Sequence, residues 1–446
     1  MIKKLLFSVL LATLLPRCVF SQSTTRVALP RTSRFFHKPG DRKFHSNIVF
    51  KVGVPNDAPS GETPASIACV YGLVPPTPGC NIATSTVNVS GGSGTIVIID
   101  AYDYPQAEAD LATFSTQFGL PQCTSASGCF TVLYAAGTKP PPDCGWAQEM
   151  ALDIEWAHAM APNANIVLVE AATSNDPDVF DAIAFANSYI STLSDIRAEM
   201  SMSLGTYETQ DAISHDSLFK QPGVVYVSSA GDFGAASNIN TLSYPATSPY
   251  VIAAGGTTVV RDSGGNFMKE TAWATDTHCN LDGSNCNLRG CSMKQLLNGQ
   301  CIGGGGGISL LEPIPSYQSI VSNIVGSNRG TPDFSADADP DSGVSVYDSF
   351  SCQGYVGWQV FGGTSVSSPL LAGIINTAGN FRSSTADELN PLYNSLNNPK
   401  YYKSIFRDIN RAVDGEFEAV RGYDLATGLG TPRGVGVLEH FLFNWF

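Results

Sequence analysis

Short apolar runs that alternate with alanine-rich segments constrain the fold of this chain more than any other feature. The apolar runs are GTIVIID (94–100), ANIVLVEAA (164–172), EMSMSL (199–204), GVVYVSSAGD (223–232) and VIAAGGTT (251–258). Between several of them lie amphipathic helical patterns, such as 147–161 and 177–191. Buried strands that alternate with such helices predict an α/β fold, with a parallel sheet flanked by helices on both faces. In sheets of this kind, functional sites lie at the carboxyl ends of the strands.

The amino-terminal region predicts an export signal followed by a basic arm. Lys3 and Lys4 precede an apolar run over 5–15, and small or polar residues follow it, so we expect a secretory signal peptide over residues 1–21. Residues 22–60 are polar and basic without clear periodicity, and we interpret them as an extended arm, either a short pro-segment or an extension. We therefore expect a secreted protein, extracellular or periplasmic.

Length and charge narrow the class of protein further. The chain has 446 residues and a formal net charge of −14, so nucleic acid and anionic membranes are poor partners. No apolar stretch after the signal is long enough to cross a bilayer. Residues 61–446 suit a single large domain, interrupted by a polar, cysteine-rich insertion near 260–302.

The cysteines predict disulfides. Of the eleven cysteines, Cys18 belongs to the expected signal, which leaves an even number in an oxidising compartment. Close spacing favours the pairs Cys69–Cys80, Cys123–Cys129, Cys279–Cys286 and Cys291–Cys301, with Cys144 and Cys352 left over. None of them shows the paired CxxC spacing of a zinc site.

A serine in a run of small residues is the first candidate for chemistry. The stretch FGGTSVSSP (361–369) places Ser365 among glycines, just before a helical pattern at 370–379. A serine hydroxyl needs a base before it can act as a nucleophile. None of the six histidines lies in a glycine-rich turn. On its own, Ser365 would more often cap a helix.

The helical pattern at 147–161 offers an acidic base instead. Glu149 and Asp153 are four residues apart, so both carboxyls project from one face of the helix. Close carboxyls cannot both ionise cheaply, so one pKa rises and a proton is shared. A carboxylate of this kind can act as general base toward a serine hydroxyl, with the second acid orienting it. A solvated helix face is the alternative, but apolar residues such as Trp156 surround the pair.

Three stretches together resemble the subtilisin pattern. They are SMSLG (201–205), SSAGDFG (228–234) and GTSVSSP (363–369). The chain departs from subtilisins because it lacks their histidine segment and because Asp232 stands where they carry an asparagine. With the Glu-x-x-x-Asp pair added, the chain resembles the sedolisins, the serine-carboxyl peptidases, from about Thr63 to the carboxyl terminus.

This resemblance implies a subtilisin-like fold in one large catalytic domain, with a Ser-Glu-Asp triad. Ser365 would be the nucleophile, Glu149 its base and Asp153 the supporting acid. A protonated Asp232 would donate a hydrogen bond to the developing oxyanion. The residues expected to line the substrate cleft are Ser203, Leu204, Gly205, Gly304 and Gly305.

The resemblance also implies one structural calcium ion near the carboxyl terminus. Oxygen ligands in a turn-rich loop are what calcium prefers. Two aspartates would supply carboxylate oxygens and three further residues would supply backbone carbonyls. The expected ligands are Asp408, Ile409, Val420, Gly422 and Asp424.

Together these features predict a secreted, acid-acting endopeptidase that cuts protein or peptide substrates as a monomer. Sedolisins generally carry a long prodomain, and we hypothesise that the arm at 22–60 plays a reduced version of its role. Two alternatives keep the same fold: an aminopeptidase that releases tripeptides, and a silent member that binds peptides or surfaces. A third is a neutral-pH subtilisin that pairs Asp100 with His158 or His215. Otherwise, Asp100 is interpreted as structural, with a contribution to the carboxyl network as the lesser alternative, and His158 as a packing or surface residue.

Overall fold

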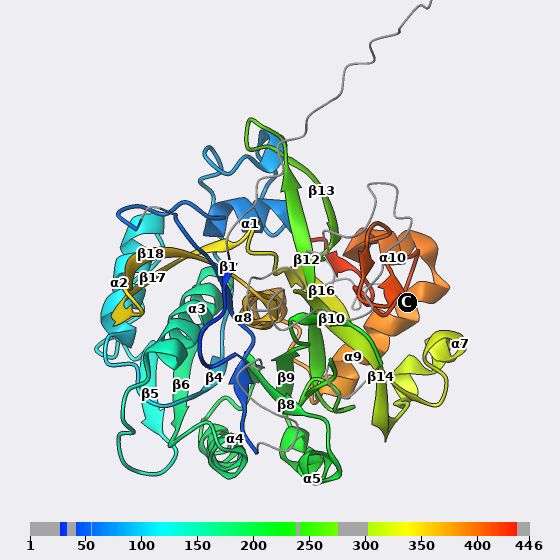
Figure 1. Ribbon diagram of the computed structural model, residues 1–446, viewed down its shortest axis with the longest axis horizontal. Helices are drawn as coiled ribbons and strands as arrows, with labels where there is room; N and C mark the ends of the chain where they lie inside the picture. The colour runs from blue at the N-terminus through cyan, green and yellow to red at the C-terminus, as the bar shows by residue number, and fades with distance from the viewer. Residues whose placement is uncertain (1–26, 34–41, 55, 238–240, 275–301, 435–446) are drawn as a thin grey trace, which may run out of the picture.

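The computed structural model describes residues 27–33, 42–54, 56–237, 241–274 and 302–434 (Figure 1). The expected signal peptide lies outside these residues. The same is true of the expected pairs Cys279–Cys286 and Cys291–Cys301 and of most of the cysteine-rich insertion.

An eight-stranded sheet forms the centre of the molecule (Figure 1). Its order is β13-β12-β9-β7-β4-β6-β5, and β16 also pairs with β12. All neighbours are parallel except β12 and β13. The bounds are β4 Thr95–Ala101, β5 Phe130–Tyr134, β6 Asn165–Ala171, β7 Ala198–Met202, β9 Val224–Ser229, β12 Ile252–Arg261, β13 Phe267–Ala272 and β16 Phe334–Asp337. The predicted apolar runs thus form the central parallel strands, because a strand covered on both faces keeps few polar side chains.

Two long helices cross the sheet side by side. They are α3 (Cys144–Met160) and α8 (Thr364–Ala378), and both contact β4. Gly373 allows their close approach, since a Cβ at this position would lie 2.5 Å from the Cβ of Met160. The Asp143 side chain caps α3 by accepting hydrogen bonds from the backbone N–H groups of Gly145 and Trp146. The helix patterns predicted from the sequence correspond to α3, α4 (Asp176–Ile190) and α8.

The amino-terminal strands join a second sheet of order β1-β3-β18-β17. Its strands are β1 Val27–Ala28, β3 Val49–Lys51, β17 Val344–Cys352 and β18 Tyr355–Gly362. A smaller sheet has the order β11-β8-β2, with β2 His45–Ser46, β8 Leu204–Tyr207 and β11 Ser243–Tyr244. The described part of the arm is therefore extended, as expected, but it is paired on both sides and not free at the surface.

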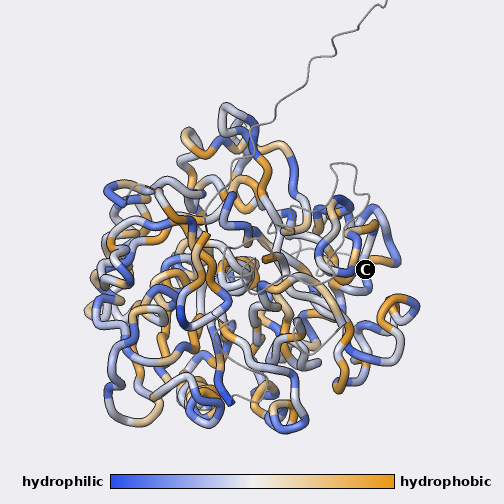
Figure 2. Tube along the Cα trace, in the orientation of Figure 1, coloured by the Kyte–Doolittle hydropathy of each residue, from blue (hydrophilic) through white to orange (hydrophobic). Residues whose placement is uncertain are grey.

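The remaining elements surround these layers. The helices are α1 Pro64–Val70, α2 Ala107–Phe118, α5 Gln210–Ile213, α7 Ser322–Val325, α9 Thr385–Asn394 and α10 Pro399–Ile405. The strands are β10 Phe233–Ala235, β14 Gly303–Pro313, β15 Asn328–Thr331, β19 Phe406–Arg407, β20 Val413–Asp414, β21 Phe417–Glu418 and β22 Thr431–Pro432. Figure 2 shows hydrophobic segments on the central elements and hydrophilic ones mainly on outer loops. No helix in the described ranges is long and apolar enough to span a membrane.

Three disulfides lie within the described residues. Cys69–Cys80 and Cys123–Cys129 confirm two predicted pairs. Cys144–Cys352 joins the two cysteines that sequence spacing left over. This third bond ties the start of α3 to the end of β17.

Candidate active site

The predicted acids and the predicted nucleophile meet in one buried site. Glu149 and Asp153 come from α3, Asp232 follows β9, and Ser365 is the second residue of α8. All are buried, with exposed fractions of 2% or less. The turn before α8 needs a glycine at position 363, where φ is +93°.

Ser203 connects Asp153 to the chain at Ser365. The Ser203 hydroxyl donates to Asp153 Oδ1 at 2.7 Å and lies 3.1 Å from the carbonyl oxygen of Ser365. In return, the Ser365 hydroxyl donates to the carbonyl oxygen of Ser203 at 3.3 Å. Ser203 was expected to contact substrate, and the structure gives its side chain a contact with the supporting acid.

Burial raises the pKa of Glu149 well above its usual value, and the nearby carboxyls of Asp153 and Asp100 raise it further. The Ser365 hydroxyl is close enough to lower this pKa in part. Neither carboxyl oxygen of Glu149 has a well-aligned hydrogen bond within the described residues. Glu149, the candidate base, is therefore a buried carboxyl beside the serine, and packing around α3 holds it in place.

Asp100 belongs to the same group of acids. It ends β4, is fully buried, and both of its carboxyl oxygens lack a hydrogen-bond partner in the described part of the chain. Burial raises its pKa, and the carboxyl of Asp153 adds to the rise. The lesser alternative predicted from the sequence, a contribution of Asp100 to the carboxyl network, is thus the one that these charges favour.

Asp232 is held by Thr364. Its Oδ1 accepts hydrogen bonds from the backbone N–H and the hydroxyl of Thr364, at 2.7 and 2.8 Å. Burial raises the pKa of Asp232 to about 7, although both bonds from Thr364 lower it. Below that pH the carboxyl is mostly protonated, so it can donate a hydrogen bond.

The predicted substrate strand already has a partner from the same chain. Leu204 pairs with Ser46, and Gly205 pairs with His45, in antiparallel register. The carbonyl oxygen of Asn47 then accepts a hydrogen bond from the backbone N–H of Ser365 at 3.0 Å. The sequence pattern gave no signal for Asn47, since it lies in an arm without periodicity.

The glycine run lies behind this site. Gly304 and Gly305 are buried in β14, and the backbone N–H of Gly305 donates to the carbonyl oxygen of Gly231 at 2.6 Å. A Cβ at Gly305 would lie 2.1 Å from the carbonyl oxygen of Ala230. The glycine run in β14 packs against the turn that carries Asp232. A contact of Gly304 and Gly305 with substrate stays a prediction.

Two of the oxygens expected to bind calcium, from Asp408 and Gly422, lie near one hydroxyl. The Tyr402 hydroxyl lies 3.2 Å from Asp408 Oδ1, 3.4 Å from the Gly422 carbonyl oxygen and 2.9 Å from that of Leu429. One hydroxyl hydrogen cannot serve three acceptors, although the backbone N–H of Gly422 also donates to Asp408 Oδ1. The Asp424 carboxylate accepts hydrogen bonds from the backbone N–H groups of Val420, Ala426 and Thr427. A hard cation with oxygen ligands fits this donor set.

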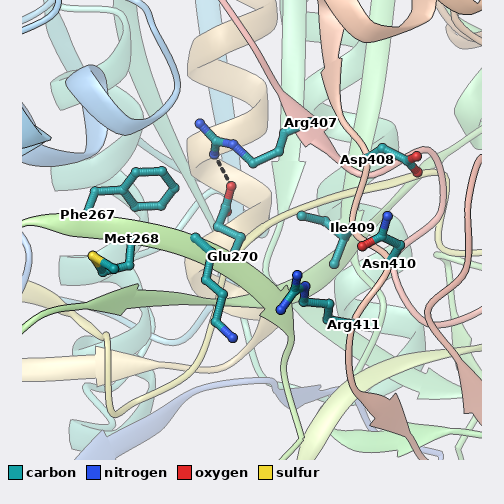
Figure 3. Close-up of a pocket in the computed structure, with 9 residues that line it drawn as sticks. Phe267, Met268, Glu270, Arg407, Asp408, Ile409, Asn410 and Arg411 are labelled. Carbon is teal, nitrogen blue, oxygen red and sulfur yellow. Dashed lines mark hydrogen bonds and ion pairs between the residues drawn. The ribbon is translucent and has the colours of Figure 1, made fainter.

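A surface pocket lies beside this loop, and Ser365 is not among the residues that line it (Figure 3). It is lined by Phe267–Glu270 of β13 and by residues 407–411. Arg407 forms an ion pair with Glu270 there, and its guanidinium stacks 4.7 Å from the Phe267 ring centre. Figure 3 shows the Asp408 carboxylate pointing away from this ion pair.

The structure contradicts the histidine alternative for the described residues. His158 is fully buried, and its Nε2 lies 2.8 Å from the carbonyl oxygen of Pro121. His215 stacks on Phe180 at 3.7 Å between ring centres. Neither histidine contacts Ser365, and His158 is a packing residue, as one of the two predicted roles had it.

The sequence was compared with protein families and with known proteins. The chain matches the subtilase family over residues 135–389. It is 28% identical to kumamolisin of Bacillus sp. (strain MN-32) over 86% of this chain and 64% of that protein. It is 30% identical to sedolisin of Pseudomonas sp. (strain 101) over 53% of this chain and 36% of that protein. The chain therefore spans less than two thirds of the length of these relatives.

A solved structure shares the fold. Pseudomonas sedolisin, described as a serine-carboxyl proteinase complexed with two molecules of pseudo-iodotyrostatin, aligns with a TM-score of 0.62 at 23% identity. The alignment covers 84% of this chain and 96% of that one. The chain belongs to the subtilase family.

Proposed function

We propose that this protein is an acid-acting serine-carboxyl endopeptidase. The observation that carries the proposal is the buried meeting of Ser365 with Glu149, while His158 and His215 are held by Pro121 and Phe180. A hydroxyl in this setting has a carboxylate as its available base. The similarity to kumamolisin and sedolisin supports the same class.

In the proposed mechanism, Ser365 Oγ attacks the scissile carbonyl carbon while Glu149 accepts its proton. Glu149 then returns the proton to the leaving amine, and water releases the acyl chain by the reverse roles. Asp153, positioned by Ser203, supports the charge on Glu149. The backbone N–H of Ser365 and a protonated Asp232 donate hydrogen bonds to the oxyanion.

Replacement of the two central residues tests this proposal. We expect Ser365→Ala to abolish cleavage of denatured casein at acidic pH, and Glu149→Gln to reduce it by about 10³-fold or more, since general base catalysis is lost. Ser188→Ala on α4 and Glu108→Gln on α2 are matched controls, because both lie on the outer faces of their helices.

Two results would count against the proposal. Retained cleavage by the Ser365→Ala variant would rule out Ser365 as the nucleophile. A rate that peaks at alkaline pH would rule out a carboxylate as the base. An inactive wild-type protein that still binds peptides would favour the silent alternative. Release of tripeptides alone, seen by mass spectrometry of the products, would favour the aminopeptidase.

We also propose that one calcium ion stabilises the carboxyl-terminal loop. Asp408 and Asp424 would supply carboxylate oxygens, and the carbonyls of Ile409, Val420 and Gly422 would complete the site. Bound calcium would supply stability to the loop, far from the chemical step. We further propose that the protein is secreted and acts as a monomer on protein or peptide substrates.

Chelation tests the calcium proposal. We expect EGTA to lower the midpoint of thermal unfolding of the inactive Ser365→Ala variant, and added calcium to restore it, because only the folded loop binds the ion. The double variant Asp408→Asn/Asp424→Asn should show neither effect. A midpoint that does not respond to EGTA or calcium would contradict the proposed site.

A further inference from the structure

Two cysteines and a histidine come together outside the active site. Cys123 lies between α2 and β5, Cys129 directly precedes β5, and His158 lies in the last turn of α3. Both sulfurs and a ring nitrogen of His158 lie within 4.8 Å of one another. No other group of three possible metal ligands lies this close together within the described residues. Thiolate and imidazole are the two kinds of ligand that zinc prefers.

The ring of His158 is held as in a metal-ligating histidine. Burial lowers the pKa of His158, so the ring is neutral and only one of its nitrogens carries a hydrogen. Nε2 lies 2.8 Å from the carbonyl oxygen of Pro121, which can only accept, so Nε2 is the donor. Nδ1 then offers a lone pair, and it is buried without a hydrogen-bond partner among the described residues. Metal-ligating histidines usually donate their other ring N–H to such a carbonyl or to a carboxylate.

The two sulfurs become ligands only after reduction, because the Cys123–Cys129 disulfide leaves no thiolate. Two equivalents of a small-molecule thiol would convert this disulfide into two thiols, while the reductant forms its own disulfide. Zinc bonds to sulfur at about 2.3 Å and to nitrogen at about 2.0 Å, so ligand atoms about 4 Å apart can share one ion. The carbonyl oxygen of Ala164, 3.6 Å from Cys129 Sγ, adds an oxygen at the same place.

We propose that Cys123, Cys129 and His158 form a zinc site when the disulfide between the two cysteines is reduced. Zn²⁺ then displaces the two thiol protons, and a water molecule or a backbone carbonyl completes four ligands. The disulfide closes only the short loop before β5, whereas the metal would also tie this loop to the end of α3. The loop is thus held by a disulfide in an oxidising compartment and by a metal in a reducing one.

Cobalt(II), a spectroscopic substitute for zinc, tests the site in the full chain that carries Ser365→Ala. A phosphine reduces the protein and is removed without oxygen, and excess calcium keeps the proposed carboxyl-terminal site filled. At pH 7 we expect the reduced protein to bind one more cobalt ion per chain than the oxidised protein. This ion should show the visible absorption of tetrahedral cobalt and a thiolate charge-transfer band.

Three variants locate the extra ion. His158→Gln can still donate a hydrogen bond to Pro121 but lacks the imidazole, so it should lose the tetrahedral spectrum. Cys123→Ser/Cys129→Ser should lose it as well, and this variant covers the case in which His158→Gln does not fold. Cys69→Ser/Cys80→Ser is the matched control, because it removes another short disulfide that has no histidine in such a group. It should keep the extra ion.

Thiol modification gives a separate readout for each cysteine in one sample. The reduced protein reacts with iodoacetamide with and without zinc, and mass spectrometry measures the modified peptides. Cys129 and Cys80 are both partly exposed, so they make a matched pair. We expect zinc to slow the modification of Cys129 by about tenfold or more and to leave that of Cys80 unchanged, because a bound thiolate is a poor nucleophile.

Several outcomes would overturn the proposed site. They are the absence of an extra ion in the reduced protein, an extra ion that survives in folded His158→Gln, and equal protection of Cys129 and Cys80 by zinc. The last result would mean that zinc binds an unfolded chain. A reduced protein that unfolds despite added zinc, as seen by circular dichroism, would also contradict the site. None of these outcomes bears on the cleavage of casein, which judges the proposed peptidase function separately.

Discussion

At the scale of single residues, the proposed mechanism needs a proton on Asp232 before this side chain can donate to the oxyanion. Burial raises the pKa of Asp232 to about 7. Glu149 must be ionised to accept the serine proton, while Asp232 must be protonated to donate. In the proposed mechanism the raised pKa of Glu149 therefore sets the acid limit of activity, and the pKa of Asp232 sets the alkaline limit.

Replacement of Asp232 by asparagine should therefore move the alkaline limb of the pH–rate profile. An asparagine oxygen can still accept both bonds from Thr364, and its amide donates at every pH. We expect Asp232→Asn to keep more activity than Asp232→Ala, which should lose about 10²–10³-fold. Rates of peptide cleavage from pH 3 to 9 measure both effects. An unchanged alkaline limb in the asparagine variant would show that another group controls it.

The residues of the site were predictable where a short motif carries them. Ser365 lies in a small-residue turn, and Glu149 and Asp153 share a helix face, so the combination of these motifs with the subtilisin-like stretches made them candidates. The contact of Asn47 with Ser365 could not be found in this way, because it depends on pairing with strands from distant parts of the chain. The part of Asp100 in the carboxyl network was only a lesser alternative for a similar reason, since its neighbours come from α3.

At the scale of elements, the position of α3 relative to α8 sets the distance between base and nucleophile. Gly373 allows the two helices to touch, and Cys144–Cys352 fixes the start of α3 to β17. This disulfide joins cysteines 208 residues apart, whereas Cys123–Cys129 spans a separation of 6. A longer closed loop restricts the unfolded chain more.

Loss of Cys144–Cys352 should thus cost more stability than loss of the short disulfide. We expect the double variant Cys144→Ser/Cys352→Ser to lose about 4 kcal/mol of unfolding free energy, and Cys123→Ser/Cys129→Ser to lose less. Urea unfolding in the Ser365→Ala background, which prevents self-digestion, measures both. Equal losses would mean that local packing, not loop closure, dominates.

The parallel strands were predictable as elements because each is apolar throughout its length. The order of the strands in the sheet was not predictable, since the sequence of a buried strand does not indicate which strand lies next to it. The pairing of β3 with β18 was also beyond the sequence, because it joins the amino-terminal arm to a strand near the other end of the chain. That pairing places the arm beside the turn before Ser365.

At the scale of the whole molecule, buried carboxyls extend well beyond the active site. Burial raises the pKa of Glu199 to about 8, and those of Asp348 and Glu388 to about 7. Each of these side chains is 1% exposed or less. In the folded chain these carboxyls therefore stay protonated up to about pH 7, whereas in the unfolded chain they ionise near pH 4.

The sign of the pH dependence follows from these shifts. A carboxyl whose pKa is raised on folding leaves stability intact below about pH 4, and stability falls as the pH rises toward 7 or 8. We expect the thermal midpoint of the Ser365→Ala variant to fall by about 5 °C or more between pH 4 and 8. Glu199→Gln should reduce this fall, because a glutamine oxygen can still accept the bond from Asn376 but never ionises. Calorimetry across this range decides the matter, and a midpoint that rises toward neutral pH would show that the buried acids are solvated or paired in solution.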